Sequence, residues 1–106
     1  MLDKWQNFPL ALQMGHIGAE LTRAWHCKEK GEQRLMENSL WRALAMIDLT
    51  VQQATQKAIQ PARLKEILRF REVACDFFLD LGNFLIQWPA LQGYFLPFTL
   101  VRPVKT

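Results

Sequence analysis

His16 and Glu20 are the residues nearest the N-terminus whose types and spacing suit a chemical site. On a helix, positions four apart are neighbours, so the carboxylate would orient the imidazole or share a metal ion with it. A third ligand is missing, because His26 lies ten residues from His16, about 15 Å along one helix. The sequence also lacks the Glu-x-x-His and Cys-x-x-Cys patterns of metal sites. We therefore predict no metal or cofactor site and a structural role for His16.

Nucleophilic and phosphate-binding motifs are equally absent from the sequence. Ser39 is the only serine and has no glycine elbow around it, while Gly15 and Gly18 lie inside a helical pattern and follow no predicted strand. Cys27 and Cys75 lack the spacing of a disulfide framework or a redox pair, so we interpret them as free thiols. An enzyme would have to rely on His16, Glu20 and Cys27 alone, and the sequence favours other functions.

Residues 63–72 form the densest basic segment of the chain. Arg63, Lys65 and Arg69 are candidates for contact with phosphate groups, and Arg102 and Lys105 would extend such a patch. The same segment contains two glutamates at helical spacing from Arg69, so local ion pairs on a solvated helix face are the simpler interpretation. Both interpretations remain open from the sequence.

The C-terminal part of the chain is unusually aromatic, with seven aromatic residues among positions 77–98. A domain of this size cannot easily bury them all, and aromatic side chains are enriched in the central parts of protein interfaces. The sequence leaves three roles open for them, which are core packing, a partner-binding surface and contact with a lipid surface. We single out four of these residues as interface candidates: Trp88, Tyr94, Phe95 and Phe98.

Apolar residues recur every three or four positions in three long segments, which predicts three helices. The first spans residues 10–30 between Pro9 and Gly31, the second residues 32–58, and the third begins at Pro61 and ends near Leu81 before Gly82-Asn83. A shorter helix over residues 90–96 follows Pro89 and is interrupted by Pro97. The fold class is therefore all-α, an antiparallel bundle of three long helices plus a shorter, Pro-interrupted C-terminal helix.

Several positions inside these helices carry specific expectations. Gly15 and Gly18 belong to a small-residue strip, which we expect to allow close crossing by another helix, while Trp41 widens the apolar face of the second helix. In the third helix we expect Leu68 and Leu81 on the buried face. Arg71 interrupts that face, so a carboxylate or carbonyl group should meet it.

Length and composition place the chain among single globular domains. Its 106 residues are 50% hydrophobic and 22% charged, which excludes disorder, and we predict one domain with an N-terminal arm (1–9) and an aromatic-rich segment (84–106). The net charge of +3 arises in the second half, a weaker bias than most nucleic-acid-binding domains show. No signal peptide and no run of about 18 apolar residues is evident, so we predict a cytoplasmic protein.

In its length and long antiparallel helices, the chain resembles small four-helix proteins of the HEPN type, which partner nucleotidyltransferases or cleave RNA. The resemblance is architectural: that family's nuclease motif places a His after an Arg and a short polar gap, and Arg23-Ala24-Trp25-His26 is too compact and apolar to match. We predict a helical interaction protein that forms a homodimer or binds a helical partner. The alternative is an RNA- or nucleotide-related accessory protein that uses the basic helix face.

Overall fold

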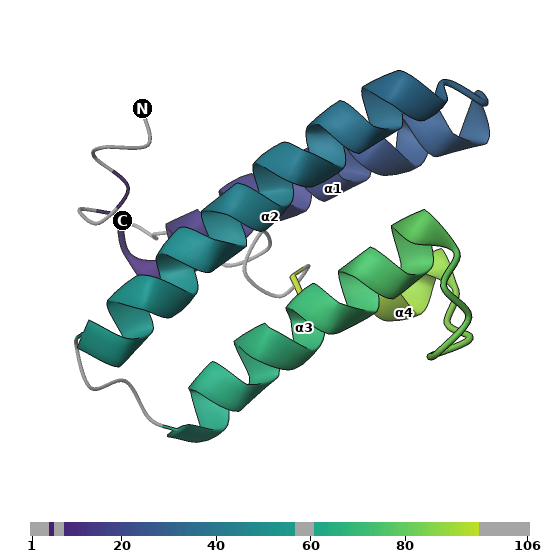
Figure 1. The fold of residues 1–106 in the computed structure, drawn as a ribbon. Coiled ribbons are helices and arrows are strands. Elements are labelled where there is room, and N and C mark those ends of the chain that lie inside the picture. The colour runs from purple at the N-terminus through teal and green to yellow at the C-terminus, as the bar shows by residue number, and fades with distance from the viewer. Residues whose placement is uncertain (1–4, 6–7, 57–60, 96–106) are drawn as a thin grey trace.

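The computed structural model describes residue 5, residues 8–56 and residues 61–95 (Figure 1). Four helices lie in these ranges: α1 (Leu10–Glu29), α2 (Gln33–Gln56), α3 (Pro61–Leu79) and α4 (Trp88–Gln92). No strand is present in the described part of the chain, so the all-α fold class is confirmed.

The ends of the helices follow the backbone preferences of a few residues. Gly31 adopts a φ of 74° and ends the first helical segment, as its position predicts. The third helix stops at Leu79, two residues before the predicted end, because Asp80 already takes a φ of 54°. The fourth helix covers Trp88–Gln92 instead of residues 90–96, and Pro97 lies outside the described residues.

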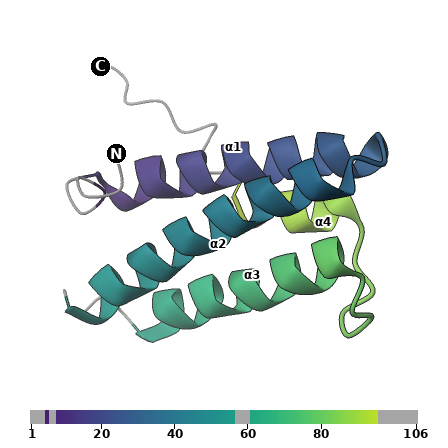
Figure 2. The same cartoon turned by 45° about the horizontal axis from the view of Figure 1, so that its top comes forward.

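The helices α1 and α2 lie side by side and run in opposite directions, joined by the short turn at Gly31 (Figures 1 and 2). In the same views α3 runs beside α2 in the opposite direction to it. Figure 2 shows the short helix α4 between α1 and α3. Because α1 and α3 make few direct contacts, side chains from α4 and the residues after it must fill the space between them.

The core contains the side chains that the helical pattern predicts. Met14, Ile17, Leu21 and Ala24 of α1 are buried against a corresponding stripe of α2. Leu68 and Leu81 do not follow the prediction, since they are 43% and 57% exposed. Leu81 lies beyond the end of α3, and Leu68 borders an open groove on α3 together with Lys65, Arg69 and Arg71.

A buried hydrogen-bond network joins Trp5 to the α1–α2 pair. The Nε1 group of Trp5 donates to Oγ1 of Thr50 at 3.0 Å, and that hydroxyl donates to Oε1 of Gln13 at 2.9 Å. Gln13 in turn donates through Nε2 to the Trp5 carbonyl at 2.9 Å. The indole is fully buried, so each of these partners satisfies a polar group that water cannot reach.

Gly18 faces an aromatic ring, which corrects the expectation that the small-residue strip lets a helix backbone approach. A Cβ atom at this position would lie 2.3 Å from Cδ1 of Phe95, whereas one at Gly15 would meet nothing within 4 Å. Phe95 is only 2% exposed. The missing side chain of Gly18 therefore makes room for the residue that follows α4.

This difference between the two glycines predicts opposite effects of the same substitution. Gly18→Ala should lower the free energy of unfolding by about 1–3 kcal/mol, because the methyl group overlaps a buried ring. Gly15→Ala should raise it by about 0.5–1 kcal/mol through helix propensity. Urea denaturation followed by circular dichroism measures both. A Gly18→Ala variant as stable as Gly15→Ala would contradict this account of the α1 surface.

Candidate binding site

Two of the four aromatic interface candidates belong to the core. Trp88 is 7% exposed and stacks on Trp25, with ring centroids 5.2 Å apart and an interplanar angle of 7°. Phe95 packs on Trp88 and Gly18. Their placement corrects the predicted surface role, because both rings already have partners within the chain. Phe98 lies outside the described residues.

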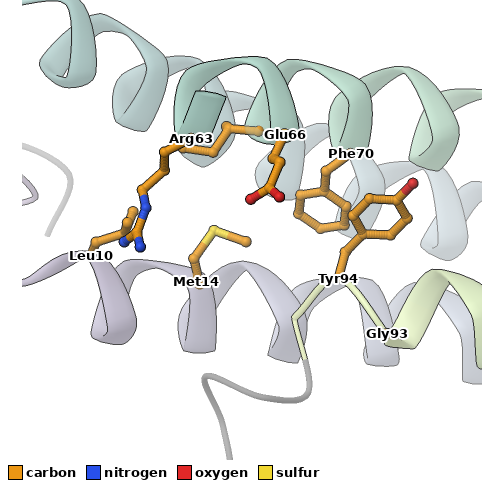
Figure 3. Close-up of a pocket in the computed structure, with 8 residues that line it drawn as sticks. Leu10, Met14, Arg63, Glu66, Phe70, Gly93 and Tyr94 are labelled. Carbon is orange, nitrogen blue, oxygen red and sulfur yellow. The ribbon is translucent and has the colours of Figure 1, made fainter. Parts of the chain in front are cut away.

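Tyr94, the remaining candidate, is half-buried and lines a cavity of about 330 Å³ between α1, α3 and the residues after α4 (Figure 3). Its ring stacks on Phe70, with centroids 5.5 Å apart and an interplanar angle of 19°. Volumes of this size are at the lower end of small-molecule pockets. The complete lining is Leu10, Met14, Arg63, Glu66, Ile67, Phe70, Gly93 and Tyr94.

The cavity has two charged residues, Arg63 and Glu66, and apolar walls. Figure 3 shows the Arg63 side chain extending toward Leu10 and the Glu66 carboxylate pointing into the space between Met14 and Phe70. Neither residue forms an ion pair within the ranges that the structure describes. The site therefore offers one cation and one anion beside an apolar surface.

The predicted ion pairs of Arg69 are wrong. Its guanidinium lies over the ring of Phe84, 5.0 Å from the centroid, and no ion pair joins it to Glu66 or Glu72, all of which are described residues. Glu66 consequently remains available to the cavity. The sequence indicates that Glu66 shares a side of α3 with the other cavity residues, because Arg63, Glu66 and Phe70 follow the spacing i, i+3, i+7.

The three phosphate-contact candidates do not share one surface. Arg63 lines the cavity, whereas Lys65 and Arg69 border an open groove on the outer side of α3, and Glu66 and Tyr94 line both sites. All three side chains are exposed. A single ligand would therefore contact Arg63 or the other pair more readily than all three.

A second surface lies where α2 and α3 run side by side, and an ion pair between Arg71 and Asp48 lies at its centre. The Nε and Nη2 groups of Arg71 donate to the two carboxylate oxygens of Asp48 at 2.6 and 3.2 Å. This hydrogen bonding raises the pKa of the Arg71 guanidinium above its ordinary value. The prediction that a carboxylate meets Arg71 is thus confirmed, with the contact at the protein surface.

We call this surface the α2–α3 face. Apolar residues lie on both sides of the ion pair, and near Leu68 the face borders the groove lined by the charged residues Lys65, Arg69 and Glu72. Trp41 is 49% exposed and Leu68 is 43% exposed. Cys75, on the same face, is half-buried, and this burial raises the pKa of its thiol. On α3, apolar residues both precede and follow Arg71 at helical spacing, so they lie on the same side of the helix. Taking the residues at helical spacing from the Arg71–Asp48 contact, we define the face as Trp41, Ala45, Asp48, Leu64, Leu68, Arg71, Cys75 and Leu79.

The scattered candidates for catalysis are not brought together. His16 stacks on Phe8, with ring centroids 5.6 Å apart, and Glu20 pairs with Arg23 and Arg42 at 3.0 and 3.2 Å. Cys27 is half-buried and free. In the described residues, no three His, Cys, Asp or Glu side chains gather as a metal site would need.

Asp76 is a buried carboxylate that was not among the functional residues predicted from the sequence. It accepts hydrogen bonds from the backbone N–H groups of Asn83 and Phe84 at 2.7 and 3.1 Å. These bonds fasten the turn after α3 and direct the chain toward α4. The sequence indicates this role through the position of Asp76 in the last turns of the predicted helix, where a carboxylate can reach the N–H groups that follow the helix end.

Comparisons with protein-family models, curated proteins and solved structures find no match to this chain. Within the described residues, each helix is too short or too polar to cross a membrane.

The Arg71–Asp48 pair should contribute little to stability because its two side chains are 36% and 57% exposed. A double-mutant cycle with Arg71→Gln and Asp48→Asn should give a coupling energy of about 0.2–1 kcal/mol, measured by urea denaturation. The coupling should shrink at high salt, since water and ions screen exposed charges. A coupling above about 3 kcal/mol would instead indicate a buried pair.

Proposed function

We propose that this chain is a cytoplasmic interaction protein, a single-domain bundle of three longer helices and a short fourth, that self-associates through the α2–α3 face. The observation that supports this is the half-exposed indole of Trp41 on a surface that also exposes Leu68. Tryptophan is among the residues most enriched at the energetic centres of interfaces. An isolated exposed leucine, such as Leu12 on α1, needs no such explanation.

The chemistry of the face suits a second copy of the same chain. In a twofold-symmetric dimer the same residues meet on both sides, so an apolar surface with an internally neutralised charge pair is self-complementary. Arg71 and Asp48 already neutralise each other within one chain, so they would not repel their counterparts. Association would also add buried area to a small domain that has a limited core of its own.

Replacing Trp41 tests this proposal. Trp41→Glu should convert a dimer into a monomer, because it places a charge in an apolar contact, while Leu12→Glu should leave the dimer intact. Size-exclusion chromatography with light scattering at several concentrations gives the masses, and circular dichroism checks that both variants stay helical. A wild-type monomer at every concentration, or equal effects of the two substitutions, would rule out this interface.

Alkylation of Cys75 gives an independent readout of the same contact. Because burial raises the pKa of this thiol, the reaction with iodoacetamide is best followed at alkaline pH, where more thiolate is present. Wild-type protein should react more slowly at high concentration than at low concentration, whereas Trp41→Glu should react at one rate. Mass spectrometry of the Cys75 peptide measures both rates.

The second candidate is an RNA- or nucleotide-related accessory protein that uses the outer side of α3. It is supported by Lys65, which is exposed and has no ion pair among the described residues, and by the neighbouring Arg69. Such a surface would contact phosphates without reading sequence.

Salt-dependent RNA retardation tests the second candidate. Labelled single-stranded RNA should be retarded at low salt, and Lys65→Gln should reduce the salt slope of log K by about one. Arg34→Gln removes an exposed charge from α2 and serves as the matched control. Absence of retardation at low salt would exclude this function, and equal effects of the two variants would show that binding is not localised on α3.

A further inference from the structure

We propose that the cavity between α1, α3 and Tyr94 binds a free α-amino acid with an apolar side chain, in its zwitterionic form. The proposal goes beyond self-association, because none of the residues that line the cavity belongs to the α2–α3 face. It rests on three features: the volume of the cavity, its apolar end and the two charges beside it.

The volume of about 330 Å³ matches a small ligand. A water molecule occupies about 30 Å³ in the liquid, so the cavity holds a molecule of roughly a dozen non-hydrogen atoms. Phenylalanine, leucine and methionine are of this size or smaller. Larger amphiphiles such as long-chain fatty acids would extend beyond it.

The apolar end of the cavity is suited to a side chain of that kind. Figure 3 shows the Phe70 and Tyr94 rings together at one end, with Met14 on the α1 side. Aromatic faces bind both aliphatic and aromatic groups, and a methionine thioether adapts to irregular shapes. This end therefore selects for apolar character more than for one particular side chain.

The polar part of the cavity has both charges that an amino acid needs. Arg63 lies in the first turn of α3, where the helix dipole favours a negative group and no acidic residue is present. A ligand carboxylate would bind there, since the guanidinium presents two parallel donors to it. Glu66 lies one turn further along α3, and its carboxylate would pair with the ligand ammonium.

Ligands with only one charge fit this arrangement less well. A simple carboxylic acid would pair with Arg63 but bring a second anion beside Glu66. A simple amine would pair with Glu66 but bring a second cation beside Arg63. The zwitterion alone complements both groups, which have no ion pair of their own in the described part of the chain. Charge complementarity thus distinguishes one ligand class from its two nearest analogues.

Binding is tested with the intact chain and three related probes: L-phenylalanine, 3-phenylpropionate and phenethylamine. Methyl-labelled methionine gives a local NMR readout, because Met14 lines the cavity while Met36 and Met46 are buried elsewhere. Phenylalanine should shift the Met14 methyl resonance and leave those of Met36 and Met46 unchanged. Each singly charged analogue should bind about tenfold more weakly, as expected for the loss of one charged hydrogen-bonding pair.

Two charge-neutralising variants assign the roles of the polar groups. Arg63→Gln should weaken phenylalanine and 3-phenylpropionate but not phenethylamine, and Glu66→Gln should weaken phenylalanine and phenethylamine but not 3-phenylpropionate. Arg34→Gln on α2 and Glu72→Gln on α3 remove the same charges outside this cavity and should change nothing. An unmoved Met14 resonance, equal binding of the three probes, or equal effects of variants and controls would each overturn the proposal.

Discussion

The packing of Trp88 and Phe95 between α1 and α3 is the contact on which the rest of this structure depends. These two helices make few direct contacts, so the rings of the C-terminal segment occupy the space that a helix-to-helix interface would otherwise fill. Stacking of Trp88 on Trp25 joins this segment to α1, and edge contact with Phe78 joins it to α3. Gly18 makes the arrangement possible because any larger side chain would overlap Phe95.

The cavity exists because the aromatic packing between α1 and α3 does not extend to the first turns of these helices. Phe95 fills the interior beside Gly18, but Tyr94 is one position earlier and faces Phe70, leaving a space bounded by the first turns of α1 and α3. The charges of Arg63 and Glu66 border this space because their side chains extend from the adjoining turns of α3. An aromatic segment that serves as core on one side therefore forms the wall of a ligand-sized site on the other.

The α2–α3 face arises from a different constraint. Most of the buried contact of α2 is with α1, where Thr50 and Gln13 complete a hydrogen-bond network around Trp5. Fewer contacts remain for α3, and the edges of the two helices leave Trp41 and Leu68 partly in solvent. Because α2 packs closely against α1 on one side, part of its opposite side stays exposed, since a helix with two neighbours cannot bury its whole circumference.

The sequence by itself determined the helices and most of their buried stripes, because hydrophobic periodicity and the backbone preferences of Pro9, Gly31 and Pro61 act locally. It also required a partner for Arg71, since an unpaired charge is costly near a core. Only the tertiary structure decided that Phe95 packs on Gly18, that Glu66 faces a cavity instead of pairing with Arg69, and that Leu68 stays exposed. These outcomes depend on contacts between segments far apart in the chain, and the spacing of residues within one helix carries no information about which neighbour will cover it.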